Sequence, residues 1–186
     1  MKRAIVLNGV QLAGKSTQIE RLVEKGFFSV VASDVLRRAA ANDQSYAQTI
    51  ALCQSSGILV PDRVTISAIL KEIRTASLGS RYVVLDGCMR TSQQAKDVSN
   101  CLRDEGYSVT VCLLHLEEDV VLERVQARGR DDDKNPEVLT SRLSAYFNNL
   151  GPVLSTLVMA GHSIHSIDAN RPVDEIHNQV CEIAGL

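Results

Sequence analysis

The chain has 186 residues, which suits one domain with a substantial buried core. Its hydrophobic fraction of 45% and charged fraction of 23% are those of an ordinary globular protein. A net charge of −2 gives no general attraction to nucleic acid or anionic membranes, and no apolar run approaches the ~20 residues that cross a bilayer. We therefore expect no nucleic-acid or membrane partner, and any phosphate binding must come from a local cluster of basic groups.

Short apolar runs alternate along the chain with longer segments whose apolar residues repeat at helical spacing. The runs predict strands at 4–7, 28–31, 82–85, 109–114 and 164–167. We expect helices at 16–25, 35–41, from 61 onward, and at 93–105, 117–128, 136–160 and after 172. Ser33 or Asp34 is the expected cap of the helix at 35–41. The alternation predicts an α/β fold with a mostly parallel sheet covered by helices on both faces, in one domain over 1–186.

Cysteine and histidine spacing gives no sign of a metal site. The five cysteines are scattered without a close pair, and the four histidines lack ligand spacing. We expect free thiols, buried or half-buried, in a reducing compartment, which favours a cytoplasmic protein without zinc. The basic start of the chain leads directly into the first strand and a glycine-rich turn, so it is interpreted as a strand rather than as a signal peptide.

A phosphate-binding loop is predicted at 9–17, whose sequence is Gly-Val-Gln-Leu-Ala-Gly-Lys-Ser-Thr. Its glycines allow backbone N–H groups to curl around an anion, and the following helix adds its partial positive charge. Lys15 adds a full charge, and Ser16 offers a hydroxyl to Mg²⁺. The alternative is a tight strand-to-helix turn that happens to carry a lysine, but this leaves Lys15 and the residues after it unexplained. The loop predicts a P-loop NTPase with five parallel strands.

Further charged residues lie where phosphates would need them. Asp86 directly follows an apolar strand, where a carboxylate can hold a water of the Mg²⁺ shell, and Gly87 after it admits a ligand close to the backbone. Arg90 lies four residues beyond Asp86. Four more arginines gather later in the chain, at 124, 128, 130 and 142. Like charges brought together favour a polyphosphate between them, although a solvated basic face is the alternative.

Four separated segments, in this order and at these intervals, resemble the adenylate kinase and nucleoside monophosphate kinase family over nearly the whole chain. They are the loop at 9–17 with Gln18 after it, Ser33-Asp34-Val35-Leu36-Arg37, Gly57-Ile58-Leu59-Val60-Pro61-Asp62, and Asp86-Gly87-Cys88-Met89-Arg90-Thr91 with Gln94. The four late arginines are similar to the family's lid and core arginines, and 168–176 is similar to the segment that packs on the ATP adenine. The resemblance implies an acceptor-binding insert at about 33–76 and a very short lid at about 125–135.

The resemblance also implies a set of site residues for ATP, Mg²⁺ and a nucleoside monophosphate. The implied catalytic clamp is Lys15, Arg90, Arg130 and Arg142. ATP would be bound by Leu12, Ala13, Gly14, Lys15, Ser16, Thr17, Arg124, Arg128 and Arg171. The acceptor would be bound by Ala32, Arg37, Ile58, Val60, Gly87, Arg90 and Gln94. Mg²⁺ would be held by Ser16 and, through water, by Asp86.

The acceptor base is the point on which the motifs disagree. Ala32 stands where adenylate kinases usually have a threonine, and at this position the chain resembles pyrimidine monophosphate kinases better. Gln94 favours adenine instead, because its amide can both donate to and accept from that base. AMP is the favoured acceptor, with UMP or CMP as the alternative. From other classes, a small-molecule kinase using Asp34 as its catalytic group and a non-catalytic nucleotide-binding relative stay open. We expect a monomer.

Overall fold

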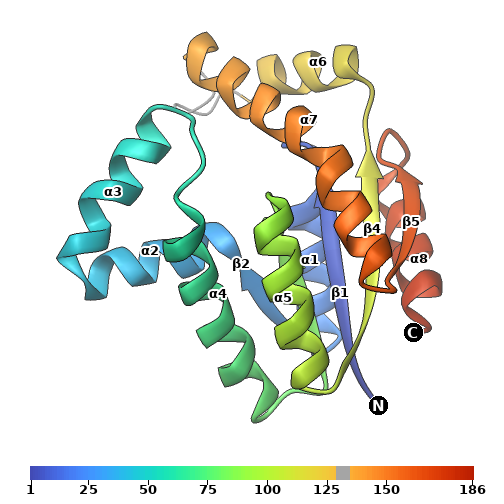
Figure 1. Cartoon of the computed structure of the whole chain (residues 1–186). Coiled ribbons are helices and arrows are strands. Elements are labelled where there is room, and N and C mark those ends of the chain that lie inside the picture. Colours follow the sequence, from blue (N-terminus) through green and yellow to red (C-terminus); the bar gives the residue numbers. More distant parts are fainter. Residues whose placement is uncertain (129–134) are drawn as a thin grey trace.

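A five-stranded parallel sheet forms the centre of the computed structural model, which describes residues 1–128 and 135–186 (Figure 1). Its strands are β1 (Lys2–Gly9), β2 (Phe28–Val31), β3 (Tyr82–Asp86), β4 (Tyr107–His115) and β5 (Ser163–Asp168). They lie in the order β2-β3-β1-β4-β5, and every neighbouring pair is parallel. The predicted fold class is confirmed, because each predicted apolar run forms a strand.

Helices cover both faces of this sheet. They are α1 (Lys15–Glu24), α2 (Ala32–Asn42), α3 (Gln44–Ser55), α4 (Asp62–Ser77), α5 (Ser92–Asp104), α6 (Glu118–Arg128), α7 (Pro136–Met159) and α8 (Val173–Ala184). One face packs on α4, α5 and α7, where Ile73, Leu102 and Leu157 are fully buried. The opposite face packs on α1 and α8 through Leu22 and Val180. Burial on both faces explains why the strands are continuous apolar runs.

The helix α2 begins earlier than its sequence indicates. It starts at Ala32 directly after β2, with Val31 as its N-cap and no side-chain cap bond, so the predicted cap at Ser33 or Asp34 is wrong. Asp34 lies inside the first turn instead, where its carboxylate is stabilised by the helix dipole and pairs with Arg37 one turn later.

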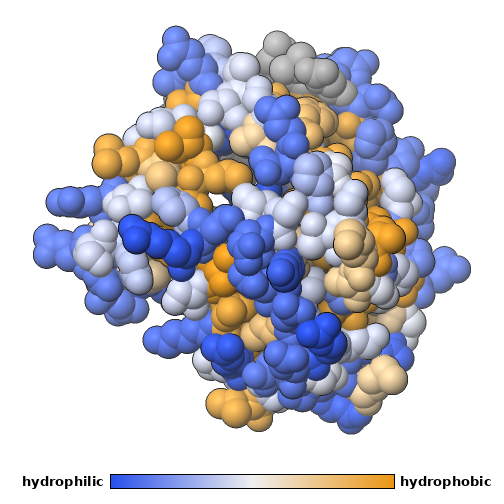
Figure 2. All heavy atoms as spheres, viewed as in Figure 1, coloured by the Kyte–Doolittle hydropathy of each residue, from blue (hydrophilic) through white to orange (hydrophobic). Residues whose placement is uncertain are grey.

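The segment between β2 and β3 builds a small core of its own. Helices α2, α3 and the start of α4 enclose it, and α3 projects away from the sheet (Figure 1). Its buried residues are Leu36, Ile50, Cys53, Val60 and Val64. Figure 2 shows apolar side chains gathered over this region at the upper left, and its exposed apolar residues include Leu52 and Ile58. We call the segment from α2 to the start of α4 the insert.

The carboxyl ends of the strands bring the sequence motifs to one edge of the sheet. Asp86 at the end of β3 pairs in register with Leu7 of β1 and with Val31 of β2. The loop after β1, the motif after β3 and the start of α2 therefore meet there. Ligands of open parallel sheets bind at this edge, where the strand order reverses between neighbours.

Two further findings concern the described part of the chain. None of the helices in 1–128 and 135–186 has the length and apolarity that a membrane crossing requires. All five cysteines are free, and all but the half-buried Cys181 are buried, which confirms that prediction.

Candidate active site

The loop at 9–17 joins β1 to α1 in a conformation that depends on glycine at two positions. A Cβ at Gly9 would lie 2.6 Å from the carbonyl oxygen of Leu114, so only glycine lets the loop approach β4 this closely. Gly14 takes the left-handed conformation, with φ of 80°, at the start of α1. Leu12 also has a left-handed φ, of 68°, which costs a leucine about 1–3 kcal/mol.

The side chain of Arg124, which lies outside the loop, is hydrogen-bonded to the strained Leu12. Its guanidinium, on α6, donates to the carbonyl oxygen of Leu12 at 3.0 Å and to that of Ala169 at 2.9 Å. Ala169 in turn donates its backbone N–H to His115 at the end of β4. Arg124 therefore joins the phosphate loop to the segment after β5, at the place where the resemblance implies an ATP-binding arginine.

Lys15 directs its ammonium group into the curve of the loop. Its Nζ donates to the carbonyl oxygens of Gly9 and Val10, both at 2.8 Å. The N-terminus of α1 begins at the same residue, so a full positive charge and the helix's free N–H groups are concentrated around one point. An anion the size of a phosphate group is what this arrangement favours.

Asp86 provides a carboxylate beside the loop. Its Oδ1 is buried, yet it has no hydrogen-bond partner among the described residues. A buried carboxylate oxygen without a partner is costly unless a cation or water completes it. This unpaired Oδ1, together with the Ser16 hydroxyl at the loop, fits a hydrated Mg²⁺. The residues that the structure describes contain no group of three or more His, Cys, Asp or Glu side chains able to hold a metal, and the absence of zinc stays a prediction.

A cavity of about 600 Å³ opens between the insert and the carboxyl edge of the sheet, a volume within the usual range of small-ligand sites. Its lining includes Ala32, Ile58, Val60, Gly87, Arg90 and Gln94. These are six of the residues predicted to bind an acceptor. The structure brings them together from three separate segments of the sequence.

A second, narrower cavity of about 130 Å³ lies between the loop and α7. Lys15 and Asp86 line it, and so do Arg90 and Arg142, which line the larger cavity as well. The two cavities therefore share a wall that carries two guanidinium groups. Arg142 also donates to the carbonyl oxygen of Gln54 at 3.4 Å, so α7 contacts the insert there.

Gln94 is buried at the wall of the larger cavity and is already hydrogen-bonded at both ends of its amide. Its Oε1 accepts from the backbone N–H of Arg90 at 2.8 Å, and its Nε2 donates to Asp62 Oδ1 at 2.9 Å. Asp62 accepts a further bond from Thr91. An amide nitrogen has two hydrogens and its oxygen two lone pairs, so one donor and one acceptor position stay available to a base.

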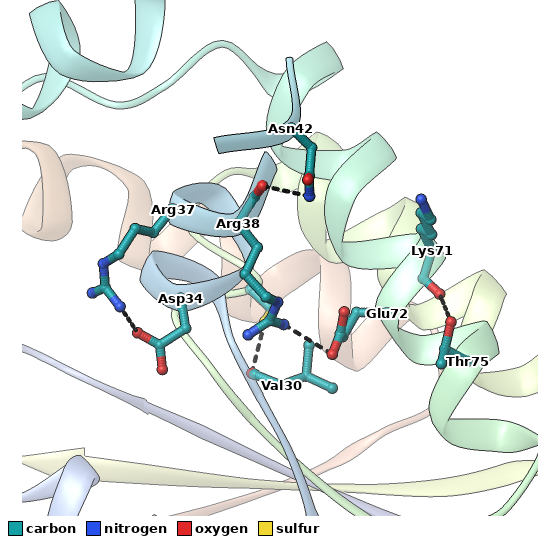
Figure 3. A network of polar contacts seen from close by, with 9 residues as sticks. Val30, Asp34, Arg37, Arg38, Asn42, Lys71, Glu72 and Thr75 are labelled. Carbon is teal, nitrogen blue, oxygen red and sulfur yellow. Dashed lines mark hydrogen bonds and ion pairs between the residues drawn. The ribbon is translucent and has the colours of Figure 1, made fainter. Parts of the chain in front are cut away.

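Arg37 is the predicted acceptor residue that is not among the described residues lining either cavity. It is exposed and pairs with Asp34 at 2.9 Å on its own helix (Figure 3). The neighbouring Arg38 points the other way and joins α2 to α4 through Glu72, also at 2.9 Å. The role predicted for Arg37 therefore stays a prediction, and Asp34 likewise lines neither cavity.

The remaining predicted arginines lie after β5 or outside the described part of the chain. Arg171 follows β5, is exposed, and pairs with Asp168 at 3.4 Å and with Glu175 at 3.5 Å. The side chain of Arg128, all of Arg130 and most of the predicted lid lie outside the described residues.

The helix α7 contributes a stripe to the site that sequence reasoning missed. Arg142, Ala145, Tyr146, Asn149 and Val153 all line the narrow cavity. They fall at i, i+3, i+4, i+7 and i+11, which is the pattern of one helical face. This periodicity, extended from Arg142, the one residue of the five that was predicted, was the signal that could have found the others.

Burial changes the pKa values of two groups that line the narrow cavity. It raises the pKa of Tyr146 to about 12, so its hydroxyl stays protonated at neutral pH. It also raises the pKa of the Cys88 thiol, with the charge of Asp86 adding to the effect. A thiol with a raised pKa is a poor nucleophile, so Cys88 is a wall residue rather than a reactive one.

The comparisons with known proteins agree with this geometry. The family model described as adenylate kinase matches residues 7–161. The adenylate kinase of Bacteroides thetaiotaomicron is 32% identical over 183 residues, covering 96% of each chain. That of Hyphomonas neptunium is 34% identical over 156 residues, covering 81% of this chain and 82% of the relative, and that of Caulobacter vibrioides is 35% identical over 156 residues, covering 81% of each. With its loop, its paired cavities and these relatives, the chain belongs to the adenylate kinase family.

Proposed function

We propose that this protein transfers the γ-phosphate of ATP to AMP, giving two molecules of ADP. The observation that carries the proposal is the shared wall: Arg90 and Arg142 line both the cavity beside Lys15 and the larger cavity of the insert. Two anionic substrates that must meet at a phosphoryl group need positive charge between them. The family relatives named adenylate kinase support the same assignment.

The donor half would hold the ATP phosphates by backbone and charge. The loop's N–H groups and the Lys15 ammonium would bind the β- and γ-phosphates, with Arg90 and Arg142 facing the group in transfer. Mg²⁺, held by the Ser16 hydroxyl and, through water, by Asp86, would supply charge that neutralises phosphate oxygens. No general base is required, because positioning and charge neutralisation dominate phosphoryl transfer.

The acceptor half would hold the monophosphate in the larger cavity. The free donor and acceptor positions of Gln94 suit the adjacent N1 and amino group of adenine, which supports AMP over UMP or CMP. Arg37 would reach the acceptor phosphate by exchanging its bond to Asp34. That exchange costs little, because exposed ion pairs contribute only about 0–1 kcal/mol.

Two other functions are weaker candidates. A small-molecule kinase built on Asp34 as catalytic group is disfavoured, because Asp34 lines neither described cavity and is paired on its own helix. A non-catalytic relative would not need an unpaired carboxylate at Asp86. Monomeric state and cytoplasmic location stay predictions.

A coupled assay with AMP, CMP, UMP, GMP and dTMP tests the proposal. We expect ATP-dependent phosphorylation with AMP as the best acceptor. Phosphorylation of none of the five would exclude the function, and a preference for CMP or UMP would replace the acceptor while keeping the reaction.

A substitution at Gln94 tests how the base is selected. Gln94→Leu removes both groups that face the base, so kcat/KM for AMP should fall about 10- to 100-fold more than kcat/KM for CMP, from the usual cost of unpaired polar groups. Gln93→Leu is the matched control, because Gln93 is exposed and bonds Asp97 on its own helix. An equal loss for every acceptor would assign Gln94 a structural role through Asp62 and Arg90.

A further inference from the structure

The phosphate loop carries a polar side chain to which the proposed reaction assigns no role. Gln11 lies at the third position of the loop, between Val10 and Leu12. Its Nε2 is buried, and it has no hydrogen-bond partner in the part of the chain that the structure describes. Leaving a buried amide donor unpaired costs roughly 1–3 kcal/mol, so a side chain of this kind needs an explanation beyond packing.

Gln11 is also placed where the two cavities meet. It lines the narrow cavity together with Lys15 and Asp86, and it lines the larger cavity together with Ala32 and Gln94. The polar side chains that line both cavities are those of Gln11, Arg90 and Arg142. The two arginines carry charge, whereas Gln11 adds an uncharged hydrogen-bond donor. It comes from the loop itself, on the side where ATP would bind.

The chemistry of the orphan atom limits what it can bind. An amide nitrogen donates and does not accept, so its ligand must present a lone pair. A metal ion is therefore excluded, and a phosphoryl oxygen fits. The narrow cavity that the Gln11 side chain helps to line also carries positive charge from Lys15 and the two arginines, which again selects an anion.

We propose that Gln11 Nε2 donates a hydrogen bond to an equatorial oxygen of the phosphoryl group during its transfer, making Gln11 a catalytic residue of this enzyme. This inference rests on the proposed function, since it assumes that donor and acceptor phosphates meet at the junction.

The step needs no proton from Gln11. An oxygen of the acceptor phosphate forms the new bond to the γ-phosphorus. The bond from that phosphorus to the β–γ bridging oxygen breaks, and its electron pair leaves with the ADP β-phosphate. Gln11 keeps both amide hydrogens and only stabilises charge on the group that moves between the two oxygens.

One variant can distinguish a catalytic role of Gln11 from a structural role. Gln11→Met keeps the length and volume of the side chain and removes the donor. Because the buried Nε2 has no described partner to lose, this change should leave the thermal unfolding midpoint unchanged or raise it. A structural role would lower the midpoint instead. Gln93→Met, on the exposed face of α5, is the matched control.

Kinetics give the first readout. In Gln11→Met, kcat for ATP with AMP should fall about 10- to 100-fold while both KM values change little, because the bond is made to the group in transfer. Gln93→Met should keep the wild-type kcat. An unchanged kcat in Gln11→Met, with wild-type enzyme active in the same assay, would overturn the inference and leave the proposed function intact.

A second readout does not depend on turnover. The side-chain amide resonances of Gln11, identified by their loss in Gln11→Met, should shift when Mg²⁺, ADP, AMP and aluminium fluoride are added together. Aluminium fluoride mimics the phosphoryl group in flight, so Mg²⁺ and ADP alone should shift these resonances far less. Unmoved resonances with the full mixture would refute the proposed contact even if the wild-type enzyme phosphorylated none of the five monophosphates.

Discussion

The two halves of the proposed site, one for the phosphate donor and one for the acceptor, are built in different ways. The donor half belongs to the central sheet: its loop approaches β4 so closely that Gly9 cannot carry a side chain, and Ala13 within it is completely buried. The acceptor half is lined mostly by the insert, whose small core is enclosed by α2, α3 and the start of α4. A phosphate loop must hold its N–H groups in fixed positions, whereas a base-binding cavity must admit and release its ligand.

The two halves meet through α7. A Cβ at Gly57 of the insert would lie 2.6 Å from the carbonyl oxygen of Val138, and the Ser141 hydroxyl donates to the carbonyl oxygen of Gly57 at 3.3 Å. Arg142 follows directly on the same helix and lines both cavities. The contact that brings the insert to α7 therefore also positions the arginine that the two substrates would share.

A substitution in the donor half should lower the activity with every acceptor equally. Lys15→Ala is the strongest test of this. The change removes the ammonium that, under the proposed function, would bind the ATP phosphates, so kcat/KM should fall by at least about 10³-fold with each monophosphate that the enzyme accepts. The coupled assay with several acceptors measures this, and Lys25→Ala at the exposed end of α1 is the control. A loss confined to one acceptor would break the division between the halves.

A matched pair of isoleucines tests whether the two cores differ in stability. Ile73 is fully buried between α4 and the sheet, and Ile50 is almost as buried, but in the insert. Ile73→Ala should lower the free energy of unfolding by about 3–4 kcal/mol, as a cavity in a large core does. Ile50→Ala should mainly open the insert, raising hydrogen exchange in α3 while that of the strands stays near wild type.

Hydrogen exchange followed residue by residue, together with thermal unfolding, distinguishes the two outcomes. The KM for the acceptor should rise in Ile50→Ala while ATP binding is kept. Equal exchange throughout the chain in both variants would mean that the insert and the sheet unfold as one unit, and the comparison would then fail.

Local patterns in the sequence were sufficient to predict the frame of the molecule. Each apolar run became a strand, and the spacing from Gly9 to Lys15 predicted the loop, because both depend on neighbouring residues only. The start of α2 was missed because Ser33 and Asp34 are good caps in isolation, whereas the end of β2 at Val31 decides where the chain turns into a helix.

Contacts between distant residues could not be predicted in this way. Gln94 was expected to face a base, but its bond to Asp62 crosses from α5 to α4 and depends on how those helices pack. Arg37 was expected at the acceptor phosphate, and in the structure it pairs with Asp34 on its own helix. Gln11 was given no role from the sequence, and only the buried, unpaired Nε2 of its side chain drew attention to it.

A substitution where the insert contacts α7 tests how tightly the two halves are joined. Gly57→Ala places a methyl group against Val138 and also forces alanine into a left-handed backbone, with φ of 68°. The strain should lower the free energy of unfolding by about 1–2 kcal/mol and raise the KM for the acceptor. Gly79→Ala is the control, since nothing lies within 4 Å of the added methyl group. Equal midpoints of thermal unfolding for both variants would show that α7 yields to the insert.

The smallest effect is expected at the contact between α8 and α1, the helix that follows the loop. The buried Gln18 Oε1 accepts from Nδ1 of the His177 ring at 3.0 Å, and Gln18 Nε2 donates to the carbonyl oxygen of Val173 at 3.3 Å. Burial lowers the pKa of His177 below its usual 6.5, and the charges of Arg21 and Lys25 lower it further.

This lowered pKa predicts a weak dependence of donor-half stability on pH. Below pH 6.5 the unfolded chain binds more protons at His177 than the folded one, so its contribution is complete above about pH 6.5 and is lost as the pH falls through the folded pKa. His177→Gln keeps a hydrogen-bonding side chain and removes the titration, so its unfolding midpoint should fall less than that of the wild type between pH 7 and pH 5. His162→Gln provides the comparison, because burial also lowers the pKa of His162 but this residue lies next to β5, away from α1. If His177→Gln followed the wild-type curve while His162→Gln flattened it, the pH response would belong to the β5 side and not to the helices behind the loop.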